Sequence, residues 1–243
     1  MSVSSRLALL FLLLQTALAQ TVSPHRPDTD TIVLLSFDSV SDDGVIPDAG
    51  NLTDGFLLEP PGVPTALTEG QDGFGKALAV GTGGVICSAP LPKELNPAKS
   101  YSELTVEAQV FLDRKLNGVS YFFSIGQRGS PGTVLGVYFT SISEMHIVRY
   151  DEGWQDDAIE LTEPLPMQEW AHLLLVVKAG GAGKRWTFRV YLNGRNIGET
   201  ESDFGFGAAI PDLHIFVGSC GSDETGFPGL IDNFRLSSVA RLP

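Results

Sequence analysis

Apolar and polar residues alternate along much of the chain. In residues 105–112, apolar side chains at even positions alternate with Glu107 and Gln109. Residues 186–192 repeat the alternation and lead into an Asn-Gly pair at 193–194, a sequence typical of a tight hairpin turn. Because strand side chains point alternately to opposite faces, a period of two predicts β-strands with one buried face.

Further strands are predicted where β-branched and aromatic residues gather between turns that contain Gly and Pro. They cover residues 31–38, 77–80, 84–88, 120–125, 133–140, 144–150, 172–178, 195–199, 213–219 and 230–237. The strands at 77–80 and 84–88 are predicted to pair, and residues 45–76 are predicted to form long loops. No segment keeps a helical period over eleven residues, so the sequence predicts an all-β sandwich or jelly roll.

The N-terminus predicts export. Arg6 precedes an apolar stretch at 7–14, and Ala17-Leu18-Ala19 forms a small-x-small cleavage site. The stretch is shorter than the roughly 20 residues that span a bilayer, which favours a cleaved signal peptide at residues 1–19 over an uncleaved anchor. We therefore expect a secreted, periplasmic or cell-surface protein with no membrane span in the mature chain.

The remainder of the chain predicts a single domain. Residues 20–30 contain two prolines and few apolar side chains, and are predicted to form a short N-terminal tether. The domain is expected at residues 31–241, a length that suits one undivided all-β unit.

Charge and composition exclude several classes of function. The 243 residues carry 29 acids against 16 Lys and Arg, a net charge of −13 that disfavours nucleic-acid binding. Two cysteines cannot make a four-cysteine zinc site, and the four histidines (His25, His146, His172 and His214) lack the His-x-x-x-His spacing, which disfavours zinc.

An acidic segment interrupts the strand pattern. Residues 151–169 contain seven acids and no base, which predicts a solvated loop, with a cation-attracting rim as the alternative. Trp154 lies in this segment. We expect it to be buried under the loop, although an exposed tryptophan there could stack on a sugar ring.

Seven short motifs carry a family resemblance. They are LSFD at 35–38, PDAGN at 47–51 with Asp54-Gly55 after it, GFGKAL at 73–78, LTVEA at 104–108, EWAH at 169–172, YLNG at 191–194 and GLIDNFRL at 229–236. In this order they resemble the laminin G-like (LamG-like) jelly roll of the concanavalin A-like lectin/glucanase superfamily. The resemblance implies a jelly-roll sandwich of two antiparallel sheets packed face to face.

A calcium site follows from the same resemblance. Asp232 has the parity of Phe234 in the last strand, so alternation predicts a carboxylate that faces inward and needs compensation. The resemblance implies a structural calcium held by Asp38, the backbone near Gly50 or Asn51, and Asp232, and oxygen ligands suit this ion. In the alternative, Asp232 accepts hydrogen bonds from loop amides and Asp38 caps a turn.

The two cysteines leave a choice open. Cys87 and Cys220 form one pair in a chain predicted to be exported, where a disulfide is chemically permitted. They could equally be two separate thiols that pack as small apolar side chains.

The predicted function is recognition rather than catalysis. Glucanases of this superfamily use a Glu-x-Asp-x-x-Glu motif, and the nearest run, at 199–203, continues with Phe204 and Phe206 where carboxylates would be needed. We expect a secreted, non-catalytic module that binds carbohydrate or an extracellular protein. The alternatives are a structural or adhesive component of an envelope or matrix, and an atypical glycoside-cleaving enzyme. The sequence singles out no ligand-binding residues.

Overall fold

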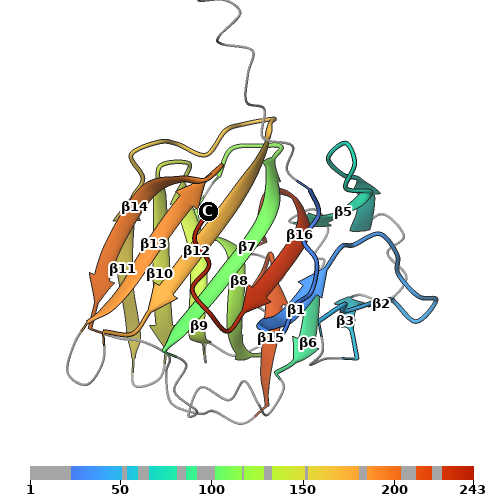
Figure 1. Cartoon of the computed structure of the whole chain (residues 1–243), viewed down its shortest axis with the longest axis horizontal. Coiled ribbons are helices and arrows are strands. Elements are labelled where there is room, and N and C mark those ends of the chain that lie inside the picture. Colours follow the sequence, from blue (N-terminus) through green and yellow to red (C-terminus); the bar gives the residue numbers. More distant parts are fainter. Residues whose placement is uncertain are drawn as a thin grey trace, which may run out of the picture.

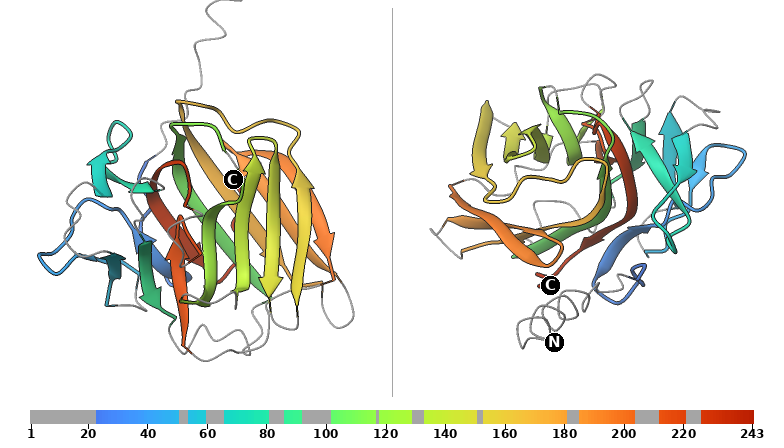
Figure 2. Two further views of the ribbon diagram at one scale, coloured as in Figure 1. Left: turned by 180° about the vertical axis from the view of Figure 1, so that it is seen from behind. Right: turned by 90° about the horizontal axis from the view of Figure 1, so that it is seen from above.

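The structure of the protein is a computed structural model. This structure describes residues 23–50, 54–59, 66–80, 86–91, 102–116, 118–128, 133–150, 153–180, 185–203, 212–220 and 226–243. Within these residues the strands form two antiparallel sheets that pack face to face (Figure 1, Figure 2). None of the described residues forms an α-helix, so none of them provides a helix that could span a membrane. The predicted all-β sandwich is confirmed.

Each sheet contains eight strands. Sheet A consists of β1 (Thr31–Leu35), β4 (Leu67–Glu69), β5 (Lys76–Val80), β7 (Glu103–Leu112), β12 (Trp170–Lys178), β13 (Trp186–Leu192), β14 (Arg195–Ser202) and β16 (Gly229–Ser237). Sheet B consists of β2 (Val45–Ile46), β3 (Phe56–Glu59), β6 (Ile86–Pro90), β8 (Ser120–Gln127), β9 (Thr133–Ser141), β10 (Glu144–Tyr150), β11 (Trp154–Glu160) and β15 (Leu213–Val217).

The order of strands corrects one predicted pairing. β5 pairs with β4 and β16 in sheet A, whereas β6 pairs with β3 and β15 in sheet B. The chain therefore crosses between the sheets after β5, and the predicted pair of 77–80 with 84–88 is wrong. The crossing has a physical basis, because Leu78 and Cys87 enter the same core from opposite layers.

The core fills the space between the two inner faces. Along β7, Val106, Ala108 and Val110 are buried there, as their alternation predicts. Phe123 of sheet B meets Phe234 of sheet A with ring centroids 5.8 Å apart. Aromatic contacts of this kind join the two layers into one hydrophobic unit.

A bulge in β16 changes the predicted direction of Asp232. Ile231 and Phe234 both face the core, although three positions separate them. The pairing with β7 shifts between Asp232 and Arg235, and Asn233 has a positive φ of 49°. One inserted residue reverses the alternation. Asp232 is fully buried as expected, but it lies on the outer side of sheet A, paired with Gln109. The prediction that it shares the direction of Phe234 is wrong.

The segment before β1 is fastened to sheet A. Arg241 donates hydrogen bonds of 2.7 and 2.8 Å to the two carboxylate oxygens of Asp28. The backbone N–H of Ser238 donates to the carbonyl of Asp30 at 2.9 Å. Residues 23–30, predicted as part of a tether, therefore lie against the C-terminal segment. The predicted signal peptide at 1–19 and residues 20–22 lie outside the described residues.

Part of the acidic segment, residues 154–160, forms a strand. β11 pairs with β10 from Trp154, opposite Tyr150, to Glu160, opposite Glu144. β11 is an edge strand of sheet B, and acidic side chains on an edge discourage pairing with other chains. The prediction of a loop is therefore wrong for residues 154–160. Trp154 is 52% exposed, so the prediction that it is buried is also wrong.

The two cysteines lie on opposite faces of sheet B. Cys87 is buried in the core between the sheets, and burial raises the pKa of its thiol. Cys220 packs against Tyr121, Tyr138 and Val148, a cluster separate from that core. The sheet lies between the two sulfur atoms, so the possible Cys87–Cys220 disulfide is not formed.

Candidate functional site

The candidate site is a groove where the edges of the two sheets meet. β14, at the edge of sheet A, contacts β11, at the edge of sheet B (Figure 1). Gly198 permits this approach, since a β-carbon there would lie only 2.7 Å from Cγ2 of Ile159. The groove has a volume of about 460 Å³. It is lined by Arg149, Trp154, Gln155, Asp156, Asp157, Arg185, Glu201 and Asp203, and we call it the Trp154 groove.

Both faces of β11 contribute to this groove. Alternation places Gln155 and Asp157 on the side of the buried Ile159, toward the space between the sheets. Trp154 and Asp156 occupy the opposite face of the strand. A ligand in the groove would therefore meet carboxylates, an amide and an indole around one strand edge.

The groove contains an exposed ion pair, between Arg185 and Asp203. Arg185 donates to Asp203 through Nε at 2.7 Å and Nη2 at 2.9 Å, which holds the pKa of the Asp203 carboxyl below its usual value. Their side chains are 54% and 79% exposed. Exposed pairs of this kind contribute little to stability, so a ligand can exchange these contacts for its own at small cost. Nη2 of Arg149 donates to Gln155 at 2.8 Å.

Asp156 links the groove to a network on sheet B. Its carboxylate accepts a hydrogen bond from the hydroxyl of Tyr138 and lies 3.2 Å from Nδ1 of His146. The rings of Tyr138 and His146 stack with centroids 4.8 Å apart. Burial and the bond to Asp156 raise the pKa of Tyr138, which stays a donor at neutral pH. The network thus fixes the Asp156 carboxylate beside Trp154.

This arrangement can contact a ligand that has both an apolar face and hydroxyl groups. An exposed indole offers an apolar face with a polar edge, and Trp154 lies 6.5 Å from the ring of Tyr138. Carboxylate, amide and guanidinium groups can accept and donate hydrogen bonds to hydroxyl groups in fixed directions. The sequence did not predict this groove, because its residues come from β10, β11, the residue before β13, the end of β14 and the residue after it. The alternatives of an exposed tryptophan and of an acidic rim at 151–169 were the signals for it.

Two of the residues predicted to bind calcium do lie together. Asp232 is fully buried, and its Oδ2 finds no hydrogen-bond partner among the described residues. A β-carbon at Gly70 would lie 2.8 Å from this Oδ2 and 2.9 Å from the carbonyl oxygen of Gly75. A β-carbon at Gly75 would lie 1.9 Å from Oδ1 of Asp38. Two carboxylates and a carbonyl therefore border the turn before β5.

The electrostatics of this turn favour a cation. Burial, together with the charge of Asp38, raises the pKa of Asp232 to about 7. A bound cation would compensate a buried carboxylate that has no other partner for Oδ2, and a donor set made only of oxygen atoms fits calcium. Asp38 also accepts the N–H of Lys76 at 3.2 Å, as in the turn-capping alternative. Asn51 lies outside the described residues.

The fold and the groove define a class: a lectin-like β-sandwich with a polar groove at one edge. A family model described as the concanavalin A-like lectin/glucanases superfamily matches residues 88–243. The chain belongs to this superfamily, and its laminin G-like resemblance is confirmed. No curated protein sequence matches the chain at a significant level.

Several solved structures share the fold. Domain 4 of AbnA, an extracellular arabinanase from Geobacillus stearothermophilus solved with arabinotriose, is 20% identical with a TM-score of 0.59, over 87% of this chain and 93% of that domain. Trypanosoma rangeli sialidase with sialic acid is 16% identical with a TM-score of 0.58, over 97% of this chain but 37% of the sialidase. The botulinum neurotoxin serotype C1 binding domain is 10% identical with a TM-score of 0.55, over 87% and 49%. At these identities the likeness shows the fold alone.

Proposed function

We propose that the protein is a secreted, non-catalytic module that recognises carbohydrate through the Trp154 groove. The observation that carries this proposal is the 52% exposed indole of Trp154, set among exposed carboxylate and guanidinium groups. An exposed indole offers an apolar face with a polar edge, on which a sugar ring can stack. The predicted signal peptide supports an extracellular location for this role.

Two further observations support recognition of a glycan. The structurally similar arabinanase domain was solved in complex with arabinotriose, and the superfamily includes lectins. The sequence lacks the Glu-x-Asp-x-x-Glu motif with which glucanases of this superfamily place their acid and nucleophile on one strand. Fold by itself does not assign function, so the proposal depends on the groove.

The test is a binding experiment with defined oligosaccharides. Wild-type protein and W154A are titrated calorimetrically with arabinotriose and with a sialylated trisaccharide, after a broader glycan array has ranked other candidates. We expect at least one oligosaccharide to bind, and W154A to lose about tenfold or more in affinity. W170F is the matched control, because Trp170 packs on Phe111, at 5.5 Å, in sheet A and away from the groove.

Two outcomes would contradict the proposal. One is wild-type protein that binds no glycan on the array, and the other is W154A that binds as tightly as wild type. Sugar release from a polysaccharide, lost on substitution of Asp156 or Glu201, would instead favour the glycoside-cleaving alternative.

We also propose that the domain holds a structural calcium ion at Asp38 and Asp232. The support is the unpartnered Oδ2 of Asp232, the nearby Asp38 carboxylate and the carbonyl of Gly75. The ion would supply positive charge that allows both carboxylates to stay ionised under the turn before β5. This site lies on sheet A and is separate from the Trp154 groove.

A further inference from the structure

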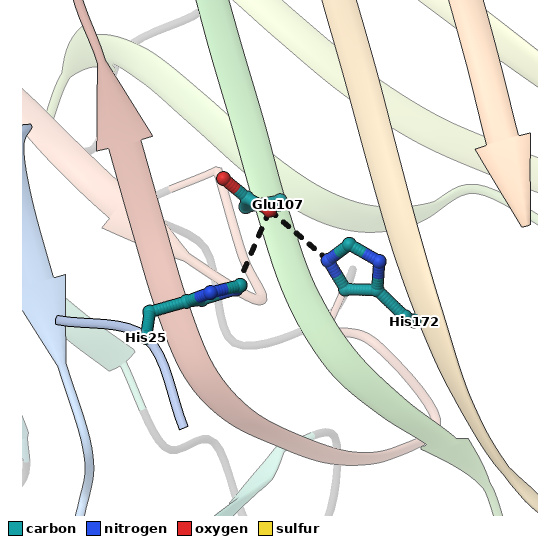
Figure 3. Close-up of side chains that lie close together, drawn as sticks. All are labelled: His25, Glu107 and His172. Carbon is teal, nitrogen blue, oxygen red and sulfur yellow. Dashed lines mark hydrogen bonds and ion pairs between the residues drawn. The ribbon is translucent and has the colours of Figure 1, made fainter. Parts of the chain in front are cut away.

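A second cluster of polar side chains lies on the outer side of sheet A (Figure 3). Glu107 belongs to β7, His172 to the neighbouring β12, and His25 to the segment that precedes β1. Nε2 of His172 lies 3.1 Å from Oε2 of Glu107, and Nε2 of His25 lies 3.4 Å from the same oxygen. The three side chains each offer one ligand atom, and these atoms all lie within 4.8 Å of one another.

The carboxylate at the centre of this Glu107 cluster is buried and fixed in direction. Glu107 is only 2% exposed. Arg235 donates to Oε1 through Nε at 2.7 Å and Nη2 at 2.6 Å, which leaves Oε2 directed at the two imidazole rings (Figure 3). Burial alone would raise its pKa, but the bonds and charges around it lower the pKa to about 2. Glu107 is therefore ionised at neutral pH.

His25 is held with one ring nitrogen directed at the cluster. Its backbone N–H donates to Oδ1 of Asn233 at 3.0 Å. Its Nε2 is buried, close to Glu107, and makes no hydrogen bond to any described residue. A buried ring nitrogen without a hydrogen bond is costly unless something else binds it, and a neutral imidazole offers such a nitrogen lone pair to a metal ion.

We infer that His25, Glu107 and His172 form a binding site for a divalent transition metal ion of the Zn²⁺ class. Tetrahedral zinc with bonds of about 2.0–2.1 Å places neighbouring ligand atoms about 3.3 Å apart. The two separations from Glu107, 3.1 and 3.4 Å, are close to this spacing, and the two imidazole nitrogens lie within 4.8 Å of each other. Two imidazoles and one carboxylate suit zinc, whereas calcium prefers oxygen atoms only.

The surroundings fit a three-ligand site with an open position. The side chains of His25 and His172 are 12% and 16% exposed, so an ion can reach them from solvent. Arg235 would not bind the ion itself. Its hydrogen bonds to Glu107 orient the ligating carboxylate, as residues outside the ligand set do in metal sites. Because His25 belongs to the N-terminal segment, the ion would tie residues 23–30 to β7 and β12.

A titration on metal-free protein tests the inference. Untagged protein from residue 20 onward is stripped with a chelator, dialysed and titrated calorimetrically with Zn²⁺, with Co²⁺ absorption as a spectroscopic reading of tetrahedral geometry. We expect one ion per chain with a dissociation constant on the order of 1 µM or lower. H25Q and H172Q should each weaken binding at least about tenfold, and the double variant should remove the tetrahedral Co²⁺ spectrum.

The controls separate this site from the rest of the molecule. H214Q removes a histidine on β15 of the other sheet and should bind Zn²⁺ like wild type, and a large excess of Ca²⁺ should not displace the ion. Glutamine keeps a polar side chain near Glu107, and the thermal unfolding of each variant verifies its fold. Wild-type protein that binds no Zn²⁺, or a folded H25Q/H172Q variant that binds as wild type does, would overturn the inference. Neither result bears on glycan binding.

Discussion

The Glu107 cluster and the Trp154 groove both contain acidic and basic side chains, but they differ in how far the charged groups are exposed to solvent. Glu107 is 2% exposed and has Arg235, His25 and His172 around it. In the groove, Arg185 and Asp203 are more than half exposed and meet only at their tips. One site has taken its charges out of water and surrounded them with partners, whereas the other leaves them hydrated.

The difference indicates what each face can do. A buried carboxylate must keep its partners, because removal of one leaves an uncompensated charge. Such a site is rigid and suits a fixed ligand such as a metal ion. Exposed pairs are worth little to the fold, so they can be exchanged for a ligand that comes and goes. The comparison therefore predicts that substitutions in the Glu107 cluster lower the stability of the fold strongly, whereas substitutions in the Trp154 groove mainly weaken ligand binding.

The largest expected effect is at Glu107. E107A should lower the free energy of unfolding by about 3 to 5 kcal/mol, because it leaves the guanidinium of Arg235, which is only 13% exposed, without its carboxylate. Urea denaturation in the presence of a chelator measures the loss without a contribution from bound metal. The matched change in the groove, E201A, should cost no more than about 0.5 kcal/mol. Similar losses for the two variants would refute the contrast between the two regions.

The second-largest effect is expected from calcium on the melting temperature. Millimolar Ca²⁺ should raise the melting temperature of chelator-treated protein by several degrees, since a ligand bound only by the folded state adds about 2.7 kcal/mol at a hundredfold excess over its Kd. D232N should abolish this response, because it removes the buried charge. D113N, a change of the same type at a half-exposed side chain just after β7, should leave it intact. A melting temperature that is the same with chelator and with Ca²⁺ would exclude the structural ion.

The sequence predicts the fold well where a strand has one buried face. Residues 105–112 and 186–192 form β7 and β13 with the expected alternation, because a period of two follows directly from strand geometry. The series of seven motifs also predicts the sandwich of two antiparallel sheets. Asp38 and Asp232 lie near each other, since the charge of Asp38 acts on Asp232, but calcium binding there stays a prediction.

The sequence could not predict features that depend on how strands are paired. The bulge at Asn233 reverses Asp232, and no local residue pattern marks it. β11 carries acids on both faces because it is an edge strand, a position that only the sheet order reveals. His25 and His172 stand on either side of Glu107 in space, although 82 and 65 residues separate them from it in sequence. Spacing along the chain is therefore a poor guide to metal sites built across a sheet.

A smaller effect is expected at Tyr138. Its ring packs in the cluster with Tyr121 and Val148, and its hydroxyl donates to Asp156 in the groove. Y138F removes the hydroxyl that donates to Asp156 and should cost about 0.5 to 1.5 kcal/mol of stability. It should also weaken oligosaccharide binding several-fold, because Asp156 loses the bond that holds it in the groove. Y121F is the control, since Tyr121 packs on Tyr138 at 5.3 Å in the same aromatic cluster. If both variants bind alike, Tyr138 does not position Asp156.

The smallest effect concerns Asp28, which fastens the N-terminal segment near the Glu107 cluster. Hydrogen bonds from Arg241 lower the pKa of Asp28 to about 2, below its usual value of 3.8. A depressed pKa in the folded state stabilises the protein above about pH 4, and this stability disappears as the pH falls toward 2. Because the Asp28 side chain is 44% exposed, D28N should cost less than about 1 kcal/mol at pH 7.

Urea denaturation of wild type and D28N between pH 7 and pH 2 measures this dependence. The gap between the two proteins should close on acidification, whereas D30N, which removes a charge two residues away, should show a smaller gap at every pH. A gap that persists at pH 2 would show that Asp28 acts through the shape of its turn rather than its charge. A gap that closes would show that Asp28 stabilises the fold through its charge, which is paired with Arg241.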